Sequence, residues 1–218
     1  MPKLASSEKL RSTISALCLL GIMVVACKYS SLPGAKMNMF EGSNAQDGAA
    51  KIKAKLGVDD VKVSSMEIHE NRLEIIVQDP KKPKNYDKYT YEKGAVKGPE
   101  PVQAMVLGNQ ELTADKLPLF NLNDINLAAT PDVCRKAALR AQIEDGKPDV
   151  ISIEFDSASN TRSKEENEKK QAELKKLDPL QLARQPFSDL VPTWRIWIKG
   201  PRATKYFYAD AKGNLSDH

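Results

Sequence analysis

Apolar residues recur first with a helical period and then with a strand period between residues 45 and 92. Residues 45–56 carry one apolar helical face, and Gly57 follows them as a residue suited to the position after a helix C-terminus. Stretches in which apolar residues recur at alternate positions then predict three strands. These strands cover residues 61–68, 72–78 and 88–92, with turns at residues 70–71 and 93–94.

The same order of elements returns near the end of the chain. Thr130, Pro131 and Asp132 suit the N-cap and the first turn of a helix, whose apolar face would be formed by Val133, Ala137 and Ala141. Alternation then predicts three further strands and a closing turn. The strands cover residues 150–156, 193–199 and 205–209, and the turn covers residues 210–214.

The two sets of strands align residue by residue. Residues 73–77 match residues 194–198, and residues 89–91 match residues 206–208. Side chains alternate between the two faces of a strand, so one face in each half should pack on that half's own helix. The side chains expected on that face are Leu73, Ile75 and Val77 in the first half and Trp194, Ile196 and Ile198 in the second.

Two segments separate these patterns. Residues 99–129 contain three prolines but are too apolar for a free linker, so this connector should pack on the two halves and join them into one body. Residues 157–192 interrupt the second half and hold a charged helical stretch at residues 163–177. Its Glu–Lys pairs four residues apart favour a helix. The insertion is either a solvent-exposed arm or an element that docks a partner.

A helix followed by three antiparallel strands, closed by the Asp210-x-x-Gly213 sequence within residues 206–215, resembles the PepSY-like domains of bacterial envelope proteins. The resemblance covers residues 45–98 and 130–218, and residues 92–94 depart from the closing pattern. It implies an α+β fold of two tandem units, each a helix on a three-stranded antiparallel sheet. It also implies peptidase inhibition or protein binding rather than catalysis.

The N-terminus has the layout of a bacterial secretory signal over residues 1–26. Basic residues come first, an apolar run follows at residues 14–25, and this run is too short to cross a bilayer. The sequence Val24-Val25-Ala26-Cys27 resembles the lipobox of lipoprotein precursors. That resemblance implies a diacylglycerol on Cys27, with a lipid bilayer as partner, and Lys28 after it favours the outer membrane on the periplasmic side. Residues 27–44 are predicted as the lipidated start and a flexible linker.

The residue inventory argues against an enzyme, a metal site or a bound cofactor. The chain has two histidines and three cysteines, too few suitably spaced ligands for zinc, and it lacks a phosphate-binding glycine loop. With Cys18 removed and Cys27 acylated, Cys134 remains as a small buried residue of the second helix. The net charge of +4 falls to about +2 after the signal segment, and no basic patch indicates nucleic-acid binding.

Four residues are candidates for binding: Trp197, Ile76, Tyr206 and Tyr208. Trp197 and Ile76 hold equivalent positions opposite the helix-facing side, where they either bury against the other half or form an exposed surface. Aromatic residues on an exposed sheet face are typical of interaction hot spots. The sequence therefore predicts a non-catalytic envelope lipoprotein that binds a protein or peptide. The alternative is a small-ligand or cell-wall-binding lipoprotein that uses the cleft between the halves.

Overall fold

The described residues of the computed structural model are 37–103, 105–107, 110–112, 118–176 and 189–217. The chain divides into two units, residues 1–36 and Met37–His218, and only residues of the second are described. The predicted signal segment, Cys27 and the linker up to residue 36 lie outside the described residues. No helix in the described part has the length and apolar character needed to span a bilayer.

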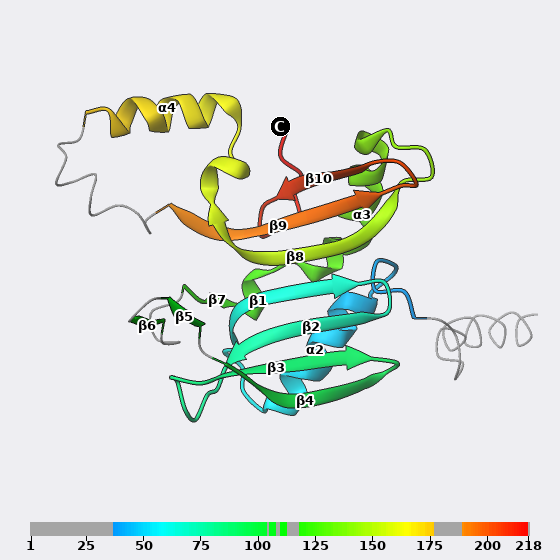
Figure 1. Cartoon of the computed structure of the whole chain (residues 1–218), viewed down its shortest axis with the longest axis vertical. Coiled ribbons are helices and arrows are strands. Elements are labelled where there is room, and N and C mark those ends of the chain that lie inside the picture. Colours follow the sequence, from blue (N-terminus) through cyan, green and yellow to red (C-terminus); the bar gives the residue numbers. More distant parts are fainter. Residues whose placement is uncertain (1–36, 104, 108–109, 113–117, 177–188, 218) are drawn as a thin grey trace, which may run out of the picture. The chain divides into compact units, whose positions relative to one another are not determined.

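An antiparallel sheet of eight strands forms the centre of the second unit, so the fold is of the α+β class (Figure 1). Seven strands follow the order β10-β9-β8-β1-β2-β3-β4, and β7 pairs with the start of β1. Their bounds are Lys62–His69 (β1), Arg72–Gln78 (β2), Tyr86–Glu92 (β3), Ala95–Val102 (β4), Phe120–Asn121 (β7), Lys147–Ser157 (β8), Leu190–Lys199 (β9) and Thr204–Ala209 (β10). Strands β5 (Met105–Leu107) and β6 (Gln110–Leu112) form a separate pair.

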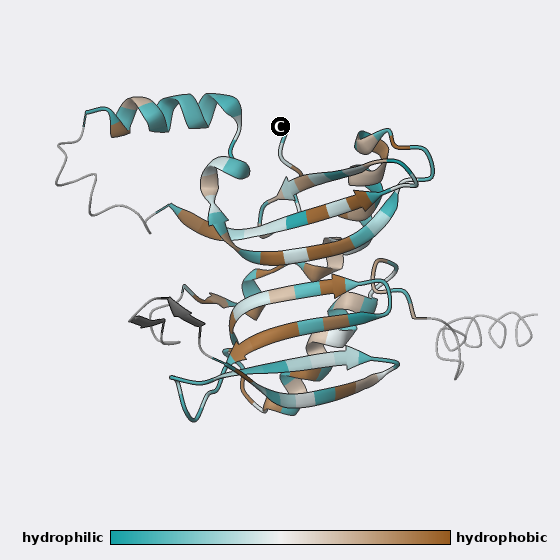
Figure 2. Ribbon diagram, viewed as in Figure 1, coloured by the Kyte–Doolittle hydropathy of each residue, from teal (hydrophilic) through white to brown (hydrophobic). Residues whose placement is uncertain are grey.

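Two helices lie on one face of the large sheet. Helix α2 (Asn44–Leu56) packs against β2, β3 and β4, and helix α3 (Thr130–Ala141) packs against β8, β9 and β10 (Figure 1). Apolar side chains between these helices and the sheet form one core that runs through both halves. The core forms on this face because hydrophobic and hydrophilic residues alternate along the strands, as Figure 2 shows. Each strand therefore presents its apolar side chains to the helices.

The order of elements is the same on both sides of the β1–β8 pair. Helix α2 precedes β1, β2 and β3, whereas α3 precedes β8, β9 and β10. The first strands of the two halves pair antiparallel, with Met66 opposite Ile153 and Ile68 opposite Ile151. Ladder hydrogen bonds therefore join the halves edge to edge in a continuous sheet.

The predicted strands all exist, and the predicted helix-facing side chains are confirmed. Each of those six side chains in β2 and β9 has no exposed surface. The predicted match of residues 89–91 to residues 206–208 is wrong by one position. Tyr91 lies opposite Leu73 and Ala209 lies opposite Trp194, so Tyr91 corresponds to Ala209. A shift of one residue exchanges the two faces of a strand.

Strand β4 was not predicted, because Pro99 and Pro101 favoured a connector. It lies at one edge of the sheet, where a residue without an N–H loses no hydrogen bond to a neighbouring strand. The connector does pack on the fold after residue 118. Among its described residues, Phe120 of β7 is buried, and so are Leu122 and Leu127 of two 3-10 turns, Leu122–Asp124 and Leu127–Ala129. Ile125, which lies between these turns, is also buried.

The N-terminal part of the described unit also differs from the prediction. Residues 37–44 were assigned to the flexible linker, but Met39 is fully buried and Phe40 is buried with it. The Met39 N–H donates to the Glu70 carbonyl oxygen over 2.7 Å, which fixes this segment beside the β1–β2 turn. The apolar side chains of this stretch explain why it packs instead of extending into solvent.

The insertion lies in the connection between β8 and β9 and contains helix α4 (Lys164–Leu174). Ser163 caps this helix in a capping box, in which its side chain accepts from the Glu166 N–H and the Glu166 carboxylate accepts from the Ser163 N–H. No residue of α4 is buried, and Figure 2 shows the helix as almost entirely hydrophilic. Arg162 and Asp189, linked by two hydrogen bonds of 2.9 and 2.5 Å, hold the base of the insertion together.

Candidate functional site

The face of the sheet opposite α2 and α3 carries the predicted binding residues. Strand alternation and register place Trp197, Val150 and Tyr206 in one cross-strand row of this face, and Arg195, Ser152 and Tyr208 in the next row. We call this surface the open face, because no described helix packs on it. Trp197 and Tyr208 are half-buried there, whereas Tyr206 is 59% exposed.

Arg195 is the centre of an arginine–aromatic cluster at the β9–β10 side of the open face. Its guanidinium carbon lies 5.7 Å from the centre of the Trp197 ring and 5.6 Å from the centre of the Tyr208 ring. Both distances fall within the range of cation–π attraction. Tyr206 extends the cluster, because its ring meets the Tyr208 ring edge-on at a centroid distance of 5.7 Å. Cross-strand pairing thus gathers three of the four predicted residues.

Two acidic residues of β8 fix the orientation of Arg195. The guanidinium donates to Asp156 over 2.8 Å and forms an ion pair with Glu154 at 3.3 Å. Burial acts to lower the pKa of Arg195, but the hydrogen bond to Asp156 and the nearby negative groups outweigh it and raise the pKa. The cation is therefore permanent, and its position is set before any partner arrives.

Ile76 does not belong to this cluster. It lies on the open face in β2, half-buried, opposite Ser65 and Lys88. Strands β1 and β8 lie between it and β9, which amounts to about 14 Å at the usual strand spacing. Ile76 and Trp197 therefore do not bury against the opposite half, because the halves meet at their edges.

A chain of ionisable residues continues the two rows of the cluster across β1 and β2, since Glu67 lies opposite Ser152 and His69 lies opposite Val150. The His69 Nε2 atom lies 3.1 Å from a Glu67 carboxylate oxygen and 3.2 Å from Arg72 Nη2. One ring nitrogen either donates or accepts, so only one of these contacts is a hydrogen bond at a time. Arg72 also donates to Glu74 over 2.5 Å. These neighbours pair His69 within an ionic network rather than with a nucleophile.

Two polar atoms of the cluster region lack a hydrogen-bond partner among the described residues. They are Ser152 Oγ and Arg195 Nε, and both are buried. An unpartnered buried polar atom costs about 1–3 kcal/mol of folding free energy. The strand register places these two residues directly opposite each other in one row of the open face.

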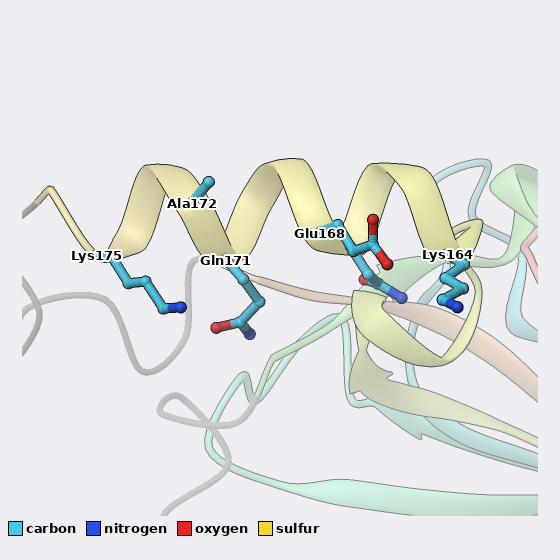
Figure 3. A pocket seen from close by; sticks show the side chains of 6 residues that line it. Lys164, Glu168, Gln171, Ala172 and Lys175 are labelled. Carbon is cyan, nitrogen blue, oxygen red and sulfur yellow. The ribbon is translucent and has the colours of Figure 1, made fainter.

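A pocket runs along α4 (Figure 3). Its described lining comes from one side of this helix: Lys164, Asn167, Glu168, Gln171, Ala172 and Lys175. Lysine and amide side chains predominate, and Ala172 is the single apolar residue among them. Leu177, the last residue of the predicted helical stretch, lies outside the described residues. The surface is chemically weaker than the arginine–aromatic cluster, because it lacks anchoring aromatic side chains.

The remaining reactive groups are placed away from both surfaces. Cys134 lies in α3 with 4% of its surface exposed, and burial raises the pKa of its thiol to about 12. It is therefore a packing residue, as predicted. Within the described ranges, histidine, cysteine and acidic side chains do not gather into a group able to hold a metal ion.

The chain matches no protein-family model, no curated protein and no solved structure.

Proposed function

We propose that this chain is a bacterial envelope lipoprotein whose folded unit binds a protein or peptide partner without catalysis. Lipidation of Cys27 would hold it to the periplasmic face of the outer membrane, and the two halves of the sheet would be tandem PepSY-like units. The repeated order of one helix and three antiparallel strands supports this family proposal.

The arginine–aromatic cluster carries the binding proposal. Tryptophan, tyrosine and arginine are the residue types that contribute most to protein interfaces, and they contribute most when they cluster. Trp197, Arg195, Tyr208 and Tyr206 form such a cluster on a face that no described helix covers. The ion pairs of Arg195 hold the cluster in place, so a partner need not order it on binding.

Capture of a partner from the cells that make the protein tests the binding proposal. Full-length chain would be crosslinked in cells, isolated from membranes and compared with Trp197→Ala and Ile76→Ala. Both variants remove an apolar side chain from the open face, but Ile76 lies outside the cluster. We expect Trp197→Ala to lose the crosslinked partner and Ile76→Ala to retain it. Equal capture by both variants would contradict a role for the cluster.

The anchor has its own test. Metabolic labelling with a radioactive fatty acid should label the wild-type chain and leave Cys27→Ser unlabelled, because the acyl chains are attached through this thiol. Separation of inner and outer membranes on a density gradient would then show where the labelled chain resides. A wild-type chain without label would refute the lipoprotein proposal and leave the binding proposal standing.

A further inference from the structure

The two halves of the sheet differ in what lies on the outer side of their third strands, which are β3 and β10. In the first half, β4 pairs with β3 from Tyr86 to Glu92. In the second half, β10 is the outermost strand among the described residues. Beside it, Leu215 bridges to Ala209, and the Ser216 N–H donates to the Tyr208 carbonyl oxygen over 2.9 Å.

Comparison of the two halves shows which strand the segment around Leu215 corresponds to. Tyr91 and Ala209 are equivalent, and their neighbours on the outer side are Val96 and Leu215. The segment around Leu215 therefore corresponds to the start of β4. Strand β4 continues along β3 until Val102 lies opposite Tyr86. In the second half, the corresponding positions lie beside Thr204 and Tyr206.

The backbone of β10 is oriented to receive a strand there. The carbonyl oxygen of Tyr208 points outward, since it accepts from Ser216. In an antiparallel strand, residues two positions apart direct their N–H and C=O groups to the same side. Tyr206 and Thr204 therefore also direct these groups away from β9, and Ser216 shows that this side accepts an antiparallel chain.

The two edges of the sheet differ in their protection against strand addition. Strand β4 contains Pro99 and Pro101, and its pairing with β3 is irregular between Lys88 and Thr90. Prolines and irregular pairing are the usual means of closing an edge. Strand β10 contains no proline and pairs with β9 in unbroken register.

Charge indicates the chemistry of the added strand. Residues 199–209 include Lys199, Arg202 and Lys205 and no acidic residue. Asp217, which follows Ser216 beside this edge, has its charge offset by an ion pair with Arg140 at 3.6 Å. Lys199 and Arg202 are exposed, and Lys205 Nζ donates to the Ala141 carbonyl oxygen over 2.8 Å. An acidic segment would be attracted to this edge, and an apolar side chain in it could pack on the exposed ring of Tyr206.

We propose that β10 accepts an extended, acidic peptide segment of a partner protein as an additional antiparallel strand. This inference rests on the proposed peptide-binding function and specifies its mode, in which main-chain hydrogen bonds at Thr204 and Tyr206 supply affinity. The open-face cluster adjoins the same edge, so side chains of the segment can reach Tyr206 and Tyr208.

A matched pair of variants isolates the main-chain contribution. Tyr206→Pro and Tyr206→Ala both remove the ring, but only proline removes the outward N–H. Full-length chain would be titrated with a fluorescent peptide of alternating glutamate and valine, and binding followed by anisotropy. We expect Tyr206→Pro to bind about tenfold more weakly than Tyr206→Ala, as loss of one hydrogen bond and a steric clash predict.

Two further measurements keep the proposal falsifiable if Tyr206→Pro fails to fold. Against the wild-type chain, a peptide N-methylated at alternate amides should lose binding, and a lysine–valine peptide should bind more weakly than the glutamate–valine one. Equal binding of the N-methylated peptide, or no binding of the glutamate–valine peptide, would overturn strand addition. Loss of partner capture in Trp197→Ala together with either result would leave the proposed function intact and reject only this mode.

Discussion

Ile68 in β1 lies directly opposite Ile151 in β8, and neither side chain has any exposed surface. Through this pair the first half of the sheet packs on the second, and the core is continuous across it. The halves of the repeat therefore share their apolar interior instead of each completing its own.

The shared interior predicts one cooperative unfolding transition. Ile151→Ala should lower the free energy of unfolding by about 2–5 kcal/mol, because it leaves a cavity between the halves. Val150→Ala is the matched control. Val150 is half-buried on the open face, so this substitution should lower the free energy of unfolding by less. Urea unfolding followed by both circular dichroism and tryptophan fluorescence should give coincident curves. Two separate transitions would show that the halves fold independently.

The two tryptophans, which lie on opposite faces of β9, should be distinguishable in solution. Trp194 has no exposed surface, whereas Trp197 is half-buried beside Arg195. Trp197→Phe should leave an emission at short wavelength that iodide does not quench, and Trp194→Phe should leave a quenchable emission. Trp194→Ala should lower the free energy of unfolding by about 3–5 kcal/mol, as expected for a buried tryptophan. Equal quenching in both phenylalanine variants would contradict the placement of the two tryptophans on opposite faces of β9.

Substitution by alanine should destabilise the fold far more at Gly213 in the closing turn than at Gly94 in the β3–β4 turn. Their φ angles are +85° and +83°, so alanine meets the same backbone strain at both positions, of about 1–2 kcal/mol. A Cβ atom at Gly213 would also lie 2.6 Å from the Ala129 Cβ atom, whereas a Cβ atom at Gly94 would meet open space. Gly213→Ala should therefore cost about 1–3 kcal/mol more in thermal or urea unfolding. Equal costs would indicate that the closing turn does not contact Ala129.

The raised pKa of Cys134 predicts a stability change at alkaline pH. Burial raises the pKa of the folded thiol from 9.0 to about 12, so only the unfolded thiol ionises between these values. The contribution of the buried neutral thiol to the free energy of unfolding is fully present below pH 9. It is lost as the pH rises toward 12, by up to about 1.4 kcal/mol per pH unit. Cys134→Ala should remove this slope from the free energy of unfolding.

Thiol labelling gives an independent check of the same burial. In a chain carrying Cys18→Ser and Cys27→Ser, the remaining thiol should react with a disulfide reagent after denaturation and resist it while folded. Rapid labelling of the folded chain would show that α3 does not bury Cys134.

The sequence predicted the local elements well because their signals are local. Alternation placed Trp194 and Leu73 on the helix side, and the residues around Gly57 marked the end of α2. The face of Tyr206 was harder to predict. Tyr89 and Tyr206 begin similar tyrosine-containing triplets, yet pairing assigns them to opposite faces, since Tyr89 lies opposite Ile75 and Tyr206 lies opposite Trp197.

Long-range pairing accounts for what the sequence did not show. Nothing near Ile68 in the chain indicates that its partner is Ile151, because pairing between distant strands depends on the whole fold. The prolines of β4 indicated a connector, although an edge strand tolerates them. The candidate cluster was therefore predicted only as separate aromatic residues, and Arg195 was missed as the group that joins them.

The prolines of β4 have a consequence for stoichiometry. A sheet that can lengthen at both sides can join copy after copy into a fibre. Pro99 and Pro101 close one side of this sheet, so growth is limited to the side of β10. Under the proposed mode, a partner strand added there would end the series after a single addition, so crowded molecules would stay separate one-to-one complexes.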